Sequence, residues 1–230
     1  DKLIDAGLVY PCTCSRRDVE TAQSAPHKED YCPGYPGTCR ERYDGYAAAR
    51  RNLPASRLPA WRFKTPPGET EFDDGFCGRQ FADVSRVDGD FVLARHPDGA
   101  GYQLAVTVDD ADMKINEVLR GDDLLRSTHW QLHIYRALGL TEPEFIHVPL
   151  VVGPDGKRLA KRHGDTRIFK MLERGVSPQR IIGLLAWWCG WAEFGEELSL
   201  PDLLPRYDLA TVPRKPVVAD NEAMGLLGLK

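Results

Sequence analysis

The sequence lacks the features of several protein classes. Its longest strongly apolar run, residues 181–189, is far shorter than the roughly 20 residues that a membrane span needs. The first residues, from Asp1 on, form neither a basic start nor an apolar stretch, so we expect no secretion signal and a cytoplasmic location. A net charge of −4 argues against a generally basic coat for nucleic acid, although the 30 Lys and Arg residues can still cluster on one face.

Cysteine is also scarce. Six cysteines in 230 residues do not make a disulfide scaffold, so metal or core roles are favoured. The chain is long enough for one large domain or two small ones, and a hydrophobic content of 42% excludes low-hydrophobicity disorder. There is no initiator Met, and residues 1–9 are typical of a helix end that runs into a strand, with Gly7 at the C-cap. We therefore expect a segment upstream of Asp1.

The remaining patterns predict a mixed α/β chain with a helical end. Turn residues separate apolar segments of strand type, and prolines, glycines and capping serines delimit helices. The expected strands are 61–64, a segment around Phe72, 91–95, 103–108, 115–119 and 145–152, the last followed by a turn at 153–156. The expected helices are a short one within 46–60, one that runs from a cap at Ser127 to Leu138, one at 168–174, and one capped by Ser177. Cys189 lies in the last helix and is expected to be a core residue. Residues 201–217 are expected to form an extended tail.

Four of the six cysteines, Cys12, Cys14, Cys32 and Cys39, lie close together in a segment that is poor in aliphatic residues. Such a segment cannot be stabilised by apolar burial alone. Thiolates at this density suit tetrahedral zinc, which would supply the missing folding free energy. A disulfide pair or incidental thiols are the alternatives, but cysteines one residue apart make a strained disulfide.

Two further patterns have both a functional and a structural interpretation. Arg120 stands at a strand end beside Gly121, where a guanidinium can fork onto a carboxylate; an ion pair with a nearby aspartate is the alternative. The loop 158–162 carries three cations after a tight turn, which suits polyphosphate recognition or, more simply, a solvated surface patch.

Taken together and in order, these segments resemble one family. Residues 89–95, the turn at Asp98, residues 102–110 and residues 119–125 look like the catalytic domain of class I glutamyl-tRNA synthetases. The sequence Leu159-Ala160-Lys161-Arg162 stands where that family carries its lysine signature loop. Within the family the chain is most similar to the short glutamyl-Q tRNA(Asp) synthetases, which lack an anticodon-binding domain.

This resemblance implies a fold. We expect a Rossmann-like class I catalytic domain, incomplete at its N-terminus, with a zinc-binding insertion and a C-terminal helical subdomain. Residues 1–45 would end the first half-fold and hold the zinc segment. Residues 46–165 would complete the insertion and the second half of the catalytic domain, and residues 166–230 would form a helical subdomain, similar to a stem-contact subdomain, with a tail.

The resemblance also implies site residues. It assigns Cys12, Cys14, Tyr35 and Cys39 to a structural zinc, Tyr102 and Arg120 to bound glutamate, and Lys161 to the phosphates of ATP, with magnesium. A guanidinium and a phenolic hydroxyl suit a carboxylate ligand, and a lysine suits charge that develops on phosphate.

The chain departs from the family pattern at three places. The signature loop has Arg158 and Ala160 in place of the first lysine and the serine. Cys32 is a softer ligand than Tyr35, only three residues away. The family's His-Ile-Gly-His signature would precede Asp1.

The activity implied by the resemblance is ATP-dependent activation of glutamate and its transfer to the queuosine base of tRNA(Asp). The partners are then L-glutamate, ATP and tRNA(Asp), with no membrane, and a monomer is favoured. Two alternatives remain open: a fragment of a glutamyl-tRNA synthetase that charges tRNA(Glu), and a zinc-stabilised RNA-binding module without catalysis.

Overall fold

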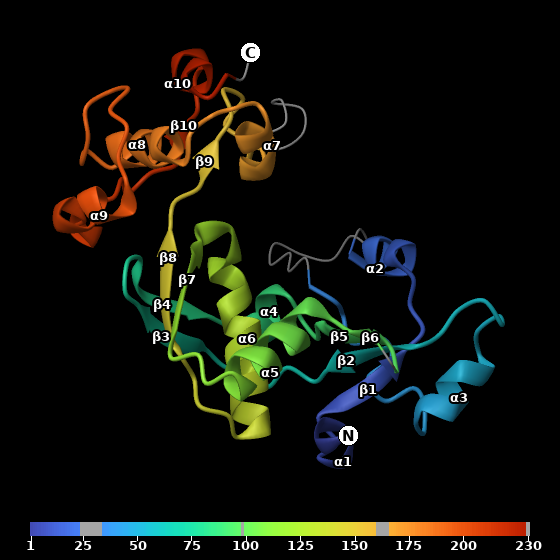
Figure 1. Cartoon of the computed structure of the whole chain (residues 1–230). Helices are drawn as coiled ribbons and strands as arrows, with labels where there is room; N and C mark the ends of the chain where they lie inside the picture. Colours follow the sequence, from blue (N-terminus) through green and yellow to red (C-terminus); the bar gives the residue numbers. More distant parts are fainter. Residues whose placement is uncertain (24–33, 98, 160–165, 229–230) are drawn as a thin grey trace. The chain divides into compact units, whose positions relative to one another are not determined.

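The computed structural model describes residues 1–23, 34–97, 99–159 and 166–228 as an α/β chain of short elements (Figure 1). The strands are β1 (Val9–Cys12), β2 (Ala60–Phe63), β3 (Thr70–Asp74), β4 (Gly78–Ala82), β5 (Val92–His96), β6 (Gly99–Ala100), β7 (Glu117–Gly121), β8 (Glu144–Val148), β9 (Val151–Val152) and β10 (Val217–Val218). The α-helices are α1 (Lys2–Asp5), α2 (Arg16–Gln23), α3 (Tyr46–Arg51), α4 (Val84–Val87), α5 (Tyr102–Asp112), α6 (Leu125–Leu138), α7 (Ile168–Glu173), α8 (Pro178–Trp188), α9 (Leu200–Leu203) and α10 (Asn221–Leu226). Among these described residues, no helix has the length and apolar character of a membrane span.

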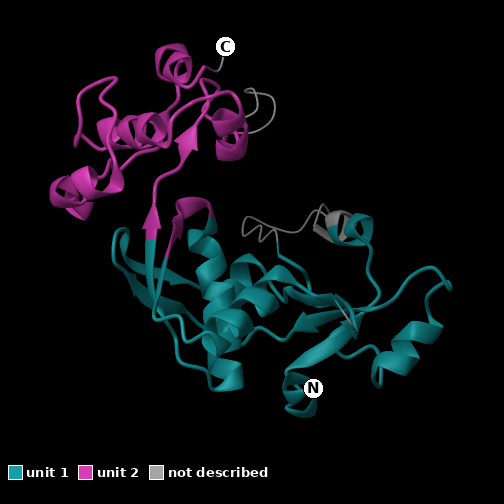
Figure 2. Cartoon of the chain, viewed as in Figure 1, with its two compact units in different colours: residues 1–118, 124–146 teal, residues 119–123, 147–230 magenta. Residues whose placement is uncertain are grey.

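The chain divides into two compact units, coloured separately in Figure 2. The first unit comprises residues 1–118 and 124–146, and the second comprises residues 119–123 and 147–230. Strands β7 and β8 each begin in the first unit and end in the second. Between β7 and β8 only Asp122 and Asp123 belong to the second unit, whereas the whole chain after β8 belongs to it.

The first unit is built around an antiparallel sheet with the strand order β1-β2-β5-β6. Its register pairs Tyr10 with Arg62 and Cys12 with Ala60, so β2 lies beside the first cysteine of the cluster. One apolar core contains Phe63 and Leu93 of this sheet and Ile134 of α6. Because side chains alternate across a strand, this sheet can bury apolar residues on one face and hold polar ones on the other.

A second sheet has the strand order β4-β3-β8-β7. Strands β3 and β4 form an antiparallel hairpin, and β3 is parallel to β8, with Asp74 opposite Phe145. A second core joins Phe145 to Leu132 and Tyr135 of α6. Helix α6 thus contributes to both of these cores. Its C-cap is Gly139, whose φ of 67° gives the left-handed end expected from the sequence.

The second unit is mainly helical. Strands β9 and β10 pair in parallel, and buried residues of α7, α8 and α10 pack together in one core. Ser177 caps α8 by accepting a hydrogen bond from the backbone N–H of Arg180, and Pro178 follows at the first helical position, as the sequence predicts.

The most important correction concerns residues 103–108, which were expected to form a strand and which belong to α5. Their Val and Thr content favours a strand locally. However, the side chains that enter the interior are Leu104, Thr107, Val108 and Ala111, which are spaced as on one face of a helix. Packing of α5 against α6 and β5 therefore decides the conformation.

Four smaller expectations are also wrong. The apolar segment 145–152 is two strands, because Pro149 between them has no N–H to continue a ladder. Helix α6 begins at Leu125 after a 3₁₀ turn, so Ser127 lies inside the helix and is not its cap. Cys189 is the C-cap of α8 and is only partly buried. Residues 201–217 form short helical turns capped by Ser199 and Asp208, not an extended tail.

Candidate metal centre and substrate site

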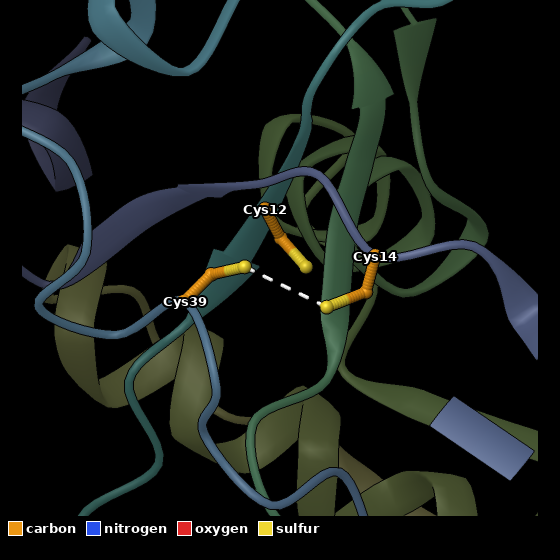
Figure 3. A group of neighbouring side chains, drawn as sticks. All are labelled: Cys12, Cys14 and Cys39. Atoms are coloured by element: carbon orange, nitrogen blue, oxygen red, sulfur yellow. Dashed lines mark hydrogen bonds between the residues drawn. The ribbon is translucent and has the colours of Figure 1, made fainter. Parts of the chain in front are cut away.

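Three cysteines of the first unit come together around one point (Figure 3). Cys12 ends β1, Cys14 follows two residues later, and Cys39 lies in a turn that the chain reaches after residues outside the described ranges. The three sulfur atoms lie within 4.8 Å of one another, and those of Cys14 and Cys39 are 3.6 Å apart. Tetrahedral zinc with Zn–S bonds of about 2.3 Å holds sulfur atoms roughly 3.8 Å apart. The sulfur spacing therefore suits a tetrahedral metal ion.

Tyr35 brings a fourth donor atom to the same point. Its hydroxyl oxygen lies 3.3 Å from Sγ of Cys12 and 3.5 Å from Sγ of Cys14, and it accepts a hydrogen bond of 2.9 Å from the backbone N–H of Cys39. The backbone of Tyr35 is fixed by a bridge to Gly89, where a Cβ atom would lie only 2.1 Å from the Tyr35 carbonyl oxygen. Cys32, the competing ligand, lies outside the described residues.

The protonation of the cluster differs from group to group. Burial raises the pKa of the Cys14 thiol to about 12. Burial and hydrogen bonds to the neighbouring thiols also raise the pKa of Tyr35 well above its usual value. Burial opposes ionisation of Cys39 as well, but hydrogen bonds from Tyr35 and Thr13 outweigh it and lower the pKa of Cys39 to about 7. Metal binding must therefore displace protons, which makes it dependent on pH.

Tyr102 is the first residue of α5 in the first unit, and its side chain is 55% exposed. The preceding Gly101 donates a backbone hydrogen bond of 2.7 Å to Leu93, and a Cβ atom on Gly101 would lie 2.8 Å from the same carbonyl oxygen. Because the start of α5 lies this close to β5, position 101 requires glycine. The same contact fixes the position of the Tyr102 backbone relative to β5.

Arg120 lies near the end of β7, in the second unit. Its Nε atom donates a hydrogen bond of 2.9 Å to Nε2 of His147, a fully buried residue of β8. This bond orients the guanidinium plane. His147 is not among the site residues expected from the sequence, although a histidine inside an apolar strand segment is a signal that could have identified it.

The start of the basic loop is tied to the residues after β7, within the same unit. Arg158 pairs with Val152 in an isolated bridge, and its guanidinium forms an ion pair of 2.8 Å with Asp123. Gly121, at the end of β7, is tightly enclosed: a Cβ atom there would lie 2.7 Å from the Leu150 side chain and 2.8 Å from the Asp123 carboxylate. Ala160, Lys161 and Arg162 of the loop lie outside the described residues, so the lysine assigned to ATP has no position here.

Comparison with known protein families identifies the class of protein to which this chain belongs. Residues 1–199 match the model described as tRNA synthetases class I (E and Q), catalytic domain. The chain belongs to this family, and the α/β class and the family expected from the sequence are confirmed. A solved glutamate tRNA ligase from Elizabethkingia meningosepticum has a similar fold, with a TM-score of 0.67 at 21% identity over 98% of this chain and 50% of that chain.

Curated relatives are more similar in sequence. The glutamyl-Q tRNA(Asp) synthetase of Symbiobacterium thermophilum is 43% identical over 96% of this chain and 68% of the relative. The protein of the same name from Rhodopirellula baltica is 39% identical over 96% of this chain and 71% of its own length. A glutamate–tRNA ligase from Trichlorobacter lovleyi is 35% identical over 98% of this chain, but the match spans only 47% of that protein.

Proposed function

We propose that the protein activates glutamate with ATP and transfers it to the queuosine base of tRNA(Asp). The main support for this proposal is the extent of the sequence match. Three glutamyl-Q tRNA(Asp) synthetases are 38–43% identical over 96–99% of this chain and 68–71% of their own lengths. The glutamate–tRNA ligases are 35–36% identical, and the match spans only 45–47% of their lengths.

Glutamate is recognised by Tyr102 and Arg120 in this proposal. A guanidinium and a carboxylate form a strong, directional pair because both are planar and carry opposite charge. The bond from Arg120 to the buried His147 supports the role, since a guanidinium held at Nε has a defined plane. We assign Tyr102 to the same substrate because a phenolic hydroxyl can donate a hydrogen bond to a carboxylate.

Activation needs positioning and charge stabilisation, and no nucleophilic side chain. A carboxylate oxygen of glutamate attacks the α-phosphorus of ATP, the bond from that phosphorus to the bridging oxygen of the β-phosphate breaks, and pyrophosphate leaves. We assign Lys161 to the negative charge that builds on the phosphates. The hydroxyl of the tRNA nucleoside then attacks the acyl carbon, and AMP leaves.

Zinc is the metal that we assign to the cysteine cluster, with Cys12, Cys14, Tyr35 and Cys39 as ligands. Three sulfurs and one oxygen that converge in a largely buried site support a closed, structural ion. When bound, zinc would tie β1 to the turn around Cys39. No step of the reaction passes through it.

The oligomeric state and the roles of the three segments are further parts of the proposal. We propose a monomer with the segments 1–45, 46–165 and 166–230 in the roles expected from the sequence. The tRNA would be held mainly through its phosphates, so its binding should weaken as salt increases.

The test uses the full-length protein with ATP and radiolabelled glutamate. Three acceptors are compared: tRNA(Asp) with queuosine, tRNA(Asp) from cells that cannot make queuosine, and tRNA(Glu). We expect labelling of the first alone, and the label should persist when only the 3′ end of that tRNA is blocked.

Two results would contradict the proposal. Labelling of tRNA(Glu) that disappears when its 3′ end is blocked would identify a glutamyl-tRNA synthetase. Binding of tRNA(Asp) without glutamate-dependent pyrophosphate exchange would identify an RNA-binding module that has lost catalysis.

A further inference from the structure

A buried arginine, Arg62 of β2, contacts two of the four residues that we assign to zinc. Its Nε atom donates a hydrogen bond of 3.3 Å to Sγ of Cys12. Its guanidinium carbon lies 3.6 Å from the centre of the Tyr35 ring, so the guanidinium stacks on the ring face. Only 9% of the residue is exposed.

The position of Arg62 is held from its other side by Asp90. One terminal nitrogen of Arg62 donates a hydrogen bond of 2.6 Å to the backbone carbonyl of Asp90. The Asp90 side chain is itself buried, and it accepts hydrogen bonds of 2.6 Å from the hydroxyl of Tyr10 and 2.9 Å from the backbone N–H of Thr65. Arg62 therefore cannot turn away from the cluster without breaking a buried network.

Within the part of the chain that the structure describes, Arg62 forms no ion pair with a carboxylate. The carboxylate of Asp90 pairs with Arg40. An arginine stays protonated in proteins, and a buried charge is costly unless an opposite charge lies close to it. Arg62 contacts two assigned ligands that can become anionic, the thiol of Cys12 and the phenol of Tyr35.

The metal-bound state supplies that opposite charge. Three thiolates around a dication carry a net charge of −1, and a tyrosinate as fourth ligand makes it −2 (formal charges). A guanidinium beside the thiolate and over the phenolate offsets one of these charges. It also holds the ring of Tyr35 so that its hydroxyl oxygen stays among the sulfur atoms.

We infer that Arg62 is a positioning residue of the metal centre, which balances the charge of the sulfur–oxygen ligand set and fixes Tyr35 as its fourth member. The inference rests on the proposed zinc site. It deepens that proposal by naming the residue that makes an anionic, tyrosine-containing ligand set stable in a buried place.

The experiment measures the zinc affinity of the full-length protein by competition with a chromophoric chelator. Arg62→Met keeps the length and loses the charge, and Arg62→Lys keeps the charge and loses the planar stack. The matched control is Arg40→Met, since Arg40 bonds to the same Asp90, with a side chain that is 42% exposed. Loss of a group that supports metal ligands typically weakens affinity by about 10–100-fold. We expect that loss for Arg62→Met, a smaller loss for Arg62→Lys, and a change of less than about threefold for Arg40→Met.

A second measurement reports on the ligand geometry. With cobalt in place of zinc, Arg62→Met should shift the ligand-to-metal charge-transfer bands, and Arg40→Met should leave them unchanged. If Arg62→Met does not fold, Arg62→Lys and Arg62→Gln are compared, and Arg62→Gln should bind zinc more weakly.

Each outcome has a separate meaning. Equal zinc affinities of Arg62→Met and Arg40→Met, or of Arg62→Lys and Arg62→Gln, would overturn the role of Arg62 and leave the zinc site intact. A wild-type protein that binds no zinc would overturn the zinc site itself.

Discussion

The hydroxyl oxygen of Tyr35 accepts a hydrogen bond of 2.9 Å from the backbone N–H of Cys39, four residues further along the chain. This bond closes a small loop and leaves the oxygen 3.5 Å from Sγ of Cys14. The tyrosine is therefore held in position by the protein before any ion binds. An oxygen donor can compete with a nearby thiol in this way, because preorganisation removes part of the entropy cost of binding.

The first prediction separates Tyr35 from Cys32 as the fourth zinc ligand. Cys39→Ser should abolish stoichiometric zinc, and Tyr35→Phe should weaken zinc binding markedly, because a phenyl ring offers no donor atom. Zinc content is measured in protein dialysed against a chelator. Retained zinc in Tyr35→Phe together with lost zinc in Cys32→Ser would make Cys32 the ligand.

The second prediction concerns Arg120 and His147. Arg120→Ala should abolish glutamate-dependent pyrophosphate exchange, because breaking a charged pair in a partly buried site costs on the order of 2–5 kcal/mol. His147→Leu should raise the KM for glutamate more than it lowers kcat, since it loosens the guanidinium without removing it. Normal exchange by Arg120→Ala would mean that the residue has a structural role.

The third prediction concerns Lys161 of the signature loop. Lys161→Ala should slow adenylate formation and leave glutamate binding largely intact, because the ammonium group acts on the phosphates as charge develops. Single-turnover kinetics measure the first quantity, and equilibrium binding of labelled glutamate measures the second. Arg158→Ala is the comparison within the same loop, since Arg158 forms an exposed ion pair with Asp123 and such pairs contribute little. If Lys161→Ala and Arg158→Ala slowed adenylate formation equally, Lys161 would have no role distinct from that of Arg158.

The fourth prediction links stability to pH through His133. Burial, with the nearby charge of Arg136, lowers the pKa of His133 to about 4. Between about pH 6.5 and pH 4 the unfolded chain therefore binds a proton that the folded protein does not. The contribution of His133 is present above about pH 6.5 and is lost as the pH falls through this window, by roughly 2–3 kcal/mol.

Urea unfolding of the wild type and of His133→Gln at pH 7 and pH 4.5 measures this contribution. Gln can still bond to Thr70, whose hydroxyl lies 2.9 Å from Nε2 of His133. The variant should lose less stability than the wild type over this range. Parallel pH profiles for the two proteins would show that His133 does not titrate as stated.

The fifth prediction compares two helical glycines of the second unit. A Cβ atom on Gly183 of α8 would lie 1.7 Å from the backbone oxygen of Glu196, so Gly183→Ala must displace the chain and should lower the free energy of unfolding by about 1–3 kcal/mol. At Gly225 of α10, apart from its chain neighbours and its own helix backbone, no atom of the described residues lies within 4 Å of such a Cβ, so Gly225→Ala should stabilise by roughly 0.5–1 kcal/mol. Thermal unfolding of both variants checks the opposite signs.

The sequence by itself determined the features that depend on neighbouring residues. The turn at 153–156, the cap of α8 at Ser177 and the left-handed ends at Gly7 and Gly139 follow from local backbone chemistry. The cysteine cluster was also recognisable, because its members lie close together along the chain.

Only the tertiary structure decided the rest. Residues 103–108 are helical because α5 packs on α6 and β5; their sequence contains both strand-forming residues and a helical spacing, and packing selects the helix. Arg62 and His147 join the candidate sites through strand pairing, across sequence separations of 50 residues to Cys12 and 27 residues to Arg120. A local pattern cannot reveal such contacts, since the free energy that holds them comes from burial and sheet formation in the folded chain.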